Sequence, residues 1–316
     1  MRSTVSATYA APADSAPIPD RSADDRSILH RSVSANGIRF HLAEAGSGPL
    51  VLLLHGFGGL WLNWRSQLTS LAAAGFRVVA PDLRGAGDSD KPPRGYDAFT
   101  LAADVAGLVR ALGERDAALV GHGHGGVLAF NTAVMYPVQV RSVVAISAPH
   151  PLRMARIRRP VRTDPYGRLL TFAAAPTAPA RRLAAADGAL LERILRSHAG
   201  PAWVASADFK RTVAEMRSAI VAPGSARGAL EPLRWVARSP WRSEGHRHRE
   251  VLQSPVGAPV LHLVGEDDRF TPPAALRDTE QFCAQEYTFA EIPGVGHYPA
   301  QEAPELVTAA IRKFLG

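Results

Sequence analysis

Apolar runs and amphipathic stretches alternate along most of the chain. The run Pro49–Leu54 is apolar at every position, as in a strand that is buried on both faces of a parallel sheet. An amphipathic stretch at Trp61–Ala74 follows, ends at Gly75, and leads into a second apolar run at Phe76–Ala80. The pattern predicts a strand, a helix and another strand in that order.

The same alternation continues to the end of the chain, with one long interruption. Asn36-Gly37 predicts a hairpin between a strand that begins at Ile28 and a strand at Ile38–Ala43. The remaining runs predict strands at Ala117–Val120, Ser142–Ile146, Pro259–Val264 and Tyr287–Ile292, and helices at Thr100–Leu112, His124–Met135, Pro273–Phe282 and Pro304–Phe314. Such alternation predicts an α/β fold, in which a mostly parallel central sheet is flanked by helices and functional residues lie at the carboxyl ends of the strands.

The interruption spans residues 151–250 and begins after Pro149-His150-Pro151. It is rich in Arg, Ala and Pro, and stretches such as Ala184–Arg196 and Phe209–Ile220 have helical patterns. We therefore divide the chain into a tail at 1–27, a core at 28–150 and 251–316, and a helical, Arg-rich insertion at 151–250. The tail is rich in Ala, Ser, Pro and Asp and has no apolar centre, which predicts disorder rather than a secretory signal.

Positive charge is concentrated in the insertion. Residues 151–250 carry 19 basic residues against 8 acidic ones, a net charge of +11, whereas the rest of the chain carries 17 against 21. We interpret this surface as a solvated Arg-rich face, with contact to anionic lipid headgroups or to an acidic ligand as the alternative. The sequence has no pattern of a nucleic-acid-binding module, so no nucleic-acid partner is expected.

Apolar content and cysteine usage narrow the class of protein further. No run approaches 18 apolar residues, so we expect a soluble, cytoplasmic protein whose contact with a membrane, if any, is peripheral. Cys283 is the only cysteine, which excludes an intrachain disulfide and a cysteine-based metal cluster. No cofactor and no metal are expected, and the sequence does not define the oligomeric state.

The candidate chemistry begins at a sharp turn between a predicted strand and a predicted helix. The segment Gly121-His122-Gly123-His124-Gly125 has the pattern Gly-x-Nuc-x-Gly, in which a strand-to-helix turn presents a nucleophilic Ser, Asp or Cys. Gly123 stands at the nucleophile position, which is therefore vacant. Only the central side chain of such a turn points at a substrate, so neither His122 nor His124 is expected to replace it, and Ser147 after the next strand is the alternative. Glycine at this position would also relieve about 1 to 3 kcal/mol of backbone strain.

From Ile28 to the C-terminus the chain resembles the α/β-hydrolase fold family. The resemblance rests on this turn and on the motifs His55-Gly56-Phe57-Gly58-Gly59, Asp82–Ser89, Gly265–Asp268 and Gly294–His297. It implies an oxyanion hole formed by the backbone N–H groups of Phe57 and His124. It also implies that His297 is the base and that Asp268 orients it, while the neighbouring Asp267 faces solvent.

A closer resemblance is to the epoxide-hydrolase-like branch of this family. It rests on the motifs Trp61–Arg65, Asp90–Pro93, Tyr96-Asp97 and Ala148–Pro151. In that branch the insertion is a helical cap, an Asp at the turn forms an ester with the substrate, a His-activated water cleaves the ester, and cap tyrosines bind the epoxide oxygen. This chain departs from the pattern because Gly123 replaces the Asp, Gly58 replaces a common proline, and Tyr166 is the only tyrosine of the insertion and the candidate cap contact.

Two functions from different classes follow from this combination. The first is a hydrolase or lyase that transforms a small lipophilic substrate by His297–Asp268 acid–base chemistry without a covalent intermediate. The second is a catalytically inactive pseudo-hydrolase that binds a small lipophilic ligand or an anionic membrane surface. Without its nucleophile, a catalytic triad retains only about 10³- to 10⁴-fold rate enhancement. A third interpretation is that Gly123 marks an engineered variant of an Asp enzyme.

Overall fold

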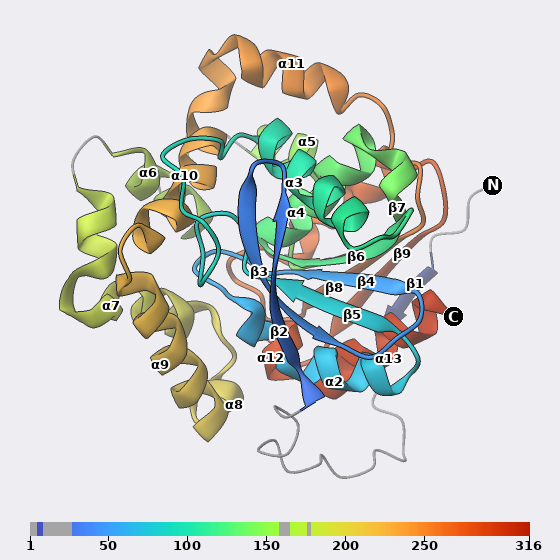
Figure 1. Ribbon diagram of the computed structural model, residues 1–316, viewed down its shortest axis with the longest axis horizontal. Coiled ribbons are helices and arrows are strands. Elements are labelled where there is room, and N and C mark those ends of the chain that lie inside the picture. Colours follow the sequence, from blue (N-terminus) through green and yellow to red (C-terminus); the bar gives the residue numbers. More distant parts are fainter. Residues whose placement is uncertain (1–4, 9–26, 158–164, 176–177) are drawn as a thin grey trace.

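One large sheet organises the molecule (Figure 1). The computed structural model describes residues 5–8, 27–157, 165–175 and 178–316. Within these residues the sheet has the strand order β1-β9-β8-β7-β6-β4-β5-β3-β2. Its strands are β1 (Val5–Thr8), β2 (Leu29–Ala35), β3 (Ile38–Ala45), β4 (Leu50–Leu54), β5 (Arg77–Pro81), β6 (Ala117–His122), β7 (Val140–Ile146), β8 (Val260–Gly265) and β9 (Tyr287–Ile292). Strand β3 is antiparallel to β2 and to β5, and the other pairs are parallel, which confirms the predicted mostly parallel sheet.

Helices cover both faces of the sheet. Leu108 of α3 and Phe130 of α4 pack in the apolar core on one face, whereas Leu68 of α2 and Ile311 of α13 pack in the core on the other. The helices of this part are η2 (Trp61–Trp64), α2 (Arg65–Ala73), α3 (Ala98–Ala111), α4 (His124–Met135), η3 (Pro137–Gln139), η5 (Pro273–Ala275), η6 (Arg277–Phe282), α12 (Pro299–Glu302) and α13 (Pro304–Leu315). The sheet is therefore a buried middle layer, as its uniformly apolar strands require.

The parallel register brings four loops to the same edge of the sheet. Gly121 at the end of β6 lies opposite Leu54 of β4, and Gly265 at the end of β8 lies opposite Ile292 of β9. The loops that follow β4, β6, β8 and β9 therefore meet at the carboxyl edge, where an α/β sheet binds its ligands.

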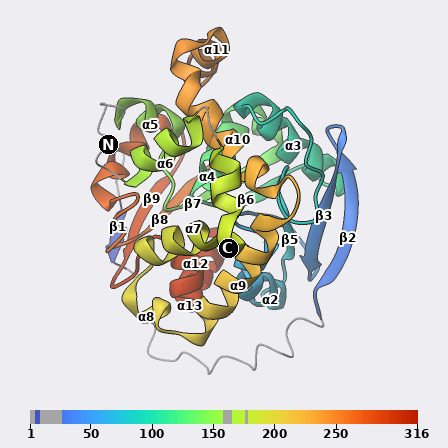
Figure 2. The same cartoon turned by 90° about the vertical axis from the view of Figure 1, so that its left-hand side faces the viewer.

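A group of helices between β7 and β8 covers this carboxyl edge (Figures 1 and 2). They are α5 (Pro151–Ile157), α6 (Pro165–Ala174), α7 (Pro179–His198), α8 (Pro201–Val204), α9 (Ala207–Val221), α10 (Ser225–Arg238), η4 (Ser239–Trp241) and α11 (Ser243–Val251). These helices, which we call the cap, have an apolar cluster of their own that includes Leu191, Phe209 and Leu233. Tyr298 of the core joins the same cluster, so the cap is packed onto the core rather than only tethered to it.

Three segments differ from the sequence expectation. In the tail expected to be disordered, Val5–Thr8 forms β1 and runs parallel to β9, with Val5 opposite Thr288; residues 1–4 and 9–26 lie outside the described part. The helix expected at Pro273–Phe282 is instead a pair of 3-10 helices, η5 and η6. The end of η6 is tied to the chain before β8, because the Val256 N–H donates to the Phe282 carbonyl at 2.8 Å and Val256 forms an isolated bridge with Cys283. Helix α7 is broken by non-helical residues at Ala185–Gly188.

Over the described ranges, no helix combines the length and the apolar character that crossing a bilayer requires.

Candidate active site

Gly123 forms the sharp turn between β6 and α4. Its φ of 52° and ψ of −116° lie in a region that side chains with a Cβ rarely adopt. A Cβ on the flanking Gly125 would lie 2.1 Å from the Leu54 carbonyl oxygen, so that position must stay glycine. A Cβ on Gly123 would instead point into open space, where its nearest neighbour beyond the turn is Nε2 of His297 at 3.8 Å. We call the volume that a side chain on Gly123 would fill the Gly123 space.

His297 faces this space and is oriented by Asp268. The two side chains are buried, and His297 Nδ1 lies 2.9 Å from Asp268 Oδ2. The other carboxylate oxygen accepts the N–H groups of Phe270 at 2.9 Å and Thr271 at 2.8 Å. Burial alone would raise the pKa of Asp268, but the charge and hydrogen bond of His297 and the Thr271 N–H hold that pKa below its usual value. The ionised carboxylate therefore keeps the proton on Nδ1 and leaves the Nε2 lone pair toward Gly123.

The neighbouring Asp267 takes no part in this arrangement. Its side chain is exposed, and only its backbone N–H is used, in a hydrogen bond of 2.9 Å to the Val295 carbonyl. The geometry thus brings together the pair that the sequence analysis selected, Asp268 and His297, and leaves Asp267 toward solvent.

Two other histidines hold the backbone of His297 in place by hydrogen bonds. His122 Nε2 donates to the His297 carbonyl at 2.7 Å, and the His297 N–H donates to the carbonyl of His198 at 2.9 Å. Burial lowers the pKa of His122 to about 3, so its ring is neutral and serves as a structural donor. His198 ends helix α7 of the cap and belongs to no motif, so nothing in the sequence pointed to it.

The oxyanion loop after β4 is held in place by the neutral ring of His55. Burial lowers the pKa of His55; its Nδ1–H donates to the Gly56 carbonyl at 3.0 Å, and its Nε2 accepts the Leu83 N–H at 2.9 Å. Phe57 and His124, whose N–H groups are the expected donors of the oxyanion hole, line the same cavity as Gly123. Neither N–H has a hydrogen-bond acceptor in the described part of the chain.

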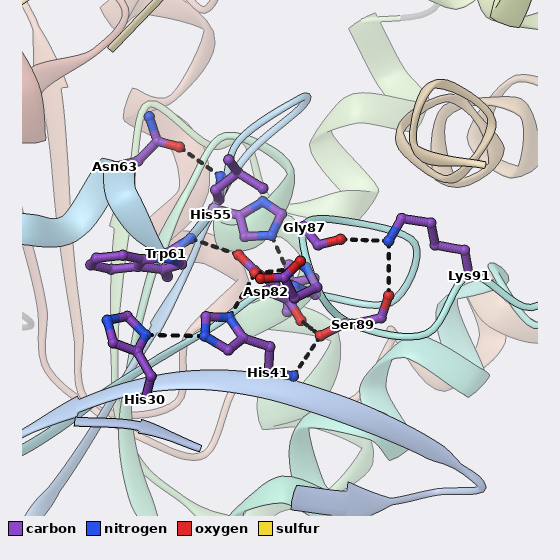
Figure 3. A network of polar contacts seen from close by, with 12 residues as sticks. His30, His41, His55, Trp61, Asn63, Asp82, Gly87, Ser89 and Lys91 are labelled. Carbon is purple, nitrogen blue, oxygen red and sulfur yellow. Dashed lines mark hydrogen bonds and ion pairs between the residues drawn. The ribbon is translucent and has the colours of Figure 1, made fainter. Parts of the chain in front are cut away.

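The turn at Asp82–Ser89 lies beside this loop and is linked to it by a network of hydrogen bonds (Figure 3). Asp82 accepts the Trp61 N–H at 3.0 Å and the Asp88 N–H at 3.1 Å, and one of its oxygens lies 2.8 Å from His41 Nδ1. His41, Asp82 and Asp88 are the described residues whose ligand atoms come close enough together to suit a metal ion. The Asp82 carboxylate is already used by these donors, so we assign this group a structural role.

An apolar cavity of about 60 Å³ extends from the Gly123 space between core and cap. Its polar lining includes His124, Ser147, His198 and His297, and its apolar lining includes Val127, Met154, Leu169, Ile194, Met216, Leu233 and Phe270. Two further cavities, of about 60 and 50 Å³, lie along the cap–core boundary, and His124 lines both of them. The site is therefore a polar centre with apolar extensions, which is the usual form of a site for a small lipophilic molecule.

The remaining candidates occupy different positions. Ser147 is fully buried at the end of β7, lines the same cavity, and lies beside Asp268, whose pKa it helps to lower. Within the described residues, no hydrogen bond joins the Ser147 hydroxyl to a base. The backbone of Tyr166 lies in α6, but its side chain lies outside the described residues. Gly58 has a φ of 65°, which proline cannot adopt, so the oxyanion loop follows a path closed to the proline that is common in the branch.

Comparisons with known proteins agree with this architecture. Residues 49–304 match the family described as alpha/beta hydrolase fold. Epoxide hydrolase 3 of Xenopus tropicalis is 32% identical over 288 residues, which cover 89% of this chain and 75% of that protein. Epoxide hydrolase 3 of Siraitia grosvenorii is 43% identical over 122 residues, which cover 38% of this chain and only 39% of that protein. The crystal structure of epoxide hydrolase A from Mycobacterium thermoresistibile superposes with a TM-score of 0.74 at 28% identity, covering 91% of this chain and 98% of that one.

The chain therefore belongs to the α/β-hydrolase fold family. Within the family it belongs to the epoxide-hydrolase-like branch.

Proposed function

We propose that the protein hydrolyses a small lipophilic substrate with a water molecule as the nucleophile. The observation that carries this proposal is the position of His297 Nε2, 3.8 Å from where a Cβ on Gly123 would lie, with the opposite ring nitrogen bound to Asp268 at 2.9 Å. A general base needs its free nitrogen within reach of the proton that it takes. A water molecule in the Gly123 space meets that condition.

The reaction proceeds without a covalent intermediate on the protein. His297 Nε2 takes one proton from the water, whose oxygen forms a bond to the electrophilic carbon of the substrate. The bond from that carbon to the leaving oxygen breaks, and the leaving oxygen recovers the proton from His297. Asp268 remains ionised throughout and stabilises the positively charged imidazolium while it carries the proton.

The cavity supports the lipophilic character of the substrate. Side chains from both core and cap line it, Val127 and Phe270 from the core and Met154, Leu169 and Met216 from the cap. Each apolar carbon that is transferred from water to such a surface favours binding. The lining also has polar side chains, which are those of Asn63, Ser147, Thr271, Tyr298, Gln301 and four histidines, His122, His124, His198 and His297.

The test is the hydrolysis of a panel of epoxides and carboxylic esters by the wild type and by His297→Ala. We expect the variant to lose about 10²- to 10⁴-fold in rate, the usual contribution of a general base. Single turnovers in ¹⁸O-labelled water should place the label in the product and none in the protein. Rates that are unchanged in His297→Ala would overturn the proposal.

A second candidate function, contact with an anionic membrane surface, is favoured by one specific feature of the cap. Trp241 is 80% exposed, and the exposed Arg238, Arg242 and Arg247 lie close to it in sequence. Exposed tryptophan beside basic residues is typical of proteins that bind the headgroup region of anionic bilayers. Sedimentation with phosphatidylglycerol vesicles tests this, because Trp241→Ser should reduce the bound fraction and pure phosphatidylcholine vesicles should bind little. Equal binding of both proteins to both vesicles would contradict it.

A further inference from the structure

Two histidines face each other at the outer border of the sheet, outside the linings of the three cavities. His30 lies on β2, the last strand in the order of the sheet, and His41 lies on the neighbouring β3. We propose that this pair binds a divalent transition-metal ion that prefers imidazole ligands, such as Zn²⁺, with water in the remaining coordination positions. The proposal is independent of the hydrolytic function.

The two rings meet nitrogen to nitrogen. His30 Nδ1 lies 3.0 Å from His41 Nε2, the ring centroids are 5.2 Å apart, and the ring planes differ by 4° (Figure 3). Rings stacked face to face would have closer centroids, so these rings meet edge to edge. Two nitrogens that share one tetrahedral Zn²⁺ at about 2.0 to 2.1 Å are about 3.3 Å apart. The observed separation is therefore close to the one that a shared metal ion requires.

His41 is already oriented as a metal ligand by Asp82. Its Nδ1 lies 2.8 Å from Asp82 Oδ2, and the two side chains are 13% and 2% exposed. Burial alone would raise the pKa of Asp82, but its hydrogen bonds with His41 and with the Trp61 N–H hold that pKa below its usual value. In the neutral ring the ionised carboxylate keeps the proton on Nδ1, so the Nε2 lone pair faces His30. Ligand histidines at metal sites are usually fixed by a carboxylate in this way.

His30 is the partner that adjusts. It is exposed on the border strand, and its ring contacts the edge of Trp61 at a centroid distance of 4.7 Å. Its Nδ1–H donates to His41 Nε2 when both rings are neutral. Metal binding requires the other tautomer of His30, with the proton on Nε2, and a turn of the ring that points both lone pairs at the metal. Because His30 is exposed, this turn leaves His41 and Asp82 in place.

Negative charge beside the pair favours a cation. The ligand atoms of His41, Asp82 and Asp88 lie within 4.8 Å of one another. Asp82 already accepts the N–H groups of Trp61 and Asp88, so it acts through His41 and by its charge rather than as a ligand. The carboxylates therefore offset part of the charge that a divalent ion brings to the surface.

The sequence analysis expected no metal because the two histidines belong to no ligand motif. His30 pairs with Ala43 and His41 pairs with Ser32, so the hairpin register makes the two side chains diagonal neighbours on one face. Within the described residues β2 pairs with β3 alone. A metal ion on this pair would therefore fasten the border strand to the turn that contains Asp82.

Titration calorimetry of the full chain with Zn²⁺ tests the pair. His30→Gln should weaken binding by at least about tenfold, since the loss of a supporting group beyond the ligands already has an effect of that size. The matched control is His246→Gln, which changes an exposed histidine of α11 and should leave the affinity unchanged. Zn²⁺ that binds to the histidines around Gly123 instead would bind His30→Gln as it binds the wild type, and that result would overturn the proposal.

His30→Cys provides a spectroscopic test, because a thiolate is also a good ligand for Zn²⁺ and Co²⁺. With Co²⁺ this variant should show a thiolate-to-metal charge-transfer band that the wild type lacks. Cys283 does not produce such a band, because it is buried and its pKa is raised to about 12. A folded His30→Cys that binds Co²⁺ without this band would place the metal elsewhere and reject the site.

Hydrogen exchange locates the bound metal. Zn²⁺ should slow amide exchange in β2 of the wild type and should leave β2 of His30→Gln unchanged. The opposite border of the sheet, β1, should be unaffected in both proteins. Protection by Zn²⁺ that is equal in the two proteins would contradict the assignment to His30 and His41.

Discussion

The carbonyl of His198 accepts the backbone N–H of His297 at 2.9 Å, so the last residue of cap helix α7 holds the loop of the proposed base. His122 donates to the carbonyl of the same residue at 2.7 Å. Both backbone groups of His297 are thus fixed, one by the core and one by the cap. Any movement of α7 that admits a substrate would release one of these bonds, so cap closure and the placement of the base are coupled.

Asp268→Asn should reduce hydrolysis by about 10²- to 10⁴-fold without unfolding the protein. An amide donates where the carboxylate accepted, which favours the wrong tautomer of His297. Asp267→Asn is the matched control, because Asp267 is exposed and directly adjacent, and its activity should equal that of the wild type. Initial rates with one ester substrate measure the activity of both variants. Similar losses of activity in the two variants would contradict the assignment of Asp268.

Arg84→Met should destabilise the fold by about 3 to 5 kcal/mol, because it leaves a buried carboxylate without its partner. Arg84 binds both oxygens of Asp104 at 2.6 Å, and the two side chains are 5% and 3% exposed. Arg39→Met is the control. Arg39 lies 3.8 Å from Asp90 with 60% of its side chain exposed, and its loss should change stability by less than about 1 kcal/mol. Urea unfolding measures the stability of both variants. Equal losses of stability would show that the buried Arg84–Asp104 pair contributes little to the stability of the fold.

Stability should fall steeply as the pH drops below about 6.5. Burial lowers the pKa to about 3 in His122, His150 and His262 and to about 4 in His124, His198 and His248. The unfolded chain binds protons at these residues from the ordinary histidine pKa downward, whereas the folded chain stays neutral. Unfolding therefore takes up protons in this window, and each residue contributes up to about 1.4 kcal/mol per pH unit.

The residue to test in this prediction is His150. It is fully buried, and its Nδ1 accepts the Leu152 N–H at 3.3 Å, which requires an unprotonated nitrogen. Urea unfolding between pH 6 and pH 4.5 gives the dependence of stability on pH. In His150→Gln this dependence should be weaker than in the wild type, because unfolding takes up about one proton fewer. A slope equal to that of the wild type would mean that His150 is protonated in the folded state.

Gly123→Asp should produce a covalent ester with an epoxide substrate. A side chain at this position points toward His297 and meets no other group within 4 Å beyond the turn. The positive φ should reduce stability by about 1 to 3 kcal/mol, which thermal unfolding would detect. Mass spectrometry after brief exposure to an epoxide should show the protein with the added mass of the substrate, and Gly123→Asn should show none. A folded Gly123→Asp that gains no mass would mean that the cap does not activate the epoxide oxygen.

The core of the fold could be predicted because its strands are uniformly apolar and its helices are regularly amphipathic. β4 and β6 are buried at every position, and their apolar sequences are by themselves typical of a parallel sheet. β1 could not be predicted, because its four residues, Val5–Thr8, are too few to show a periodicity that distinguishes a strand from a loop. Its pairing depends on β9, which lies far away in the sequence.

The candidate site was predictable in part for a similar reason. Gly123, Asp268 and His297 each follow a recognisable strand, and the parallel register alone brings their loops to one edge. His198 could not be found, because its contribution is a backbone carbonyl at the end of a cap helix, and no residue type signals that. Its position depends on how the Ala- and Arg-rich cap packs on Tyr298 and the rest of the core.

The pairing of β1 with β9 has a consequence for how the protein forms during synthesis. Val5 lies opposite Thr288, so β1 finds its partner only after the strands from β2 to β8 have been synthesised. Contacts so distant in sequence form late, because a large loop must close before they can stabilise anything. The opposite border of the sheet, the β2–β3 hairpin, is local and can form early. The two borders of one sheet should therefore acquire protection from hydrogen exchange at opposite ends of the folding process.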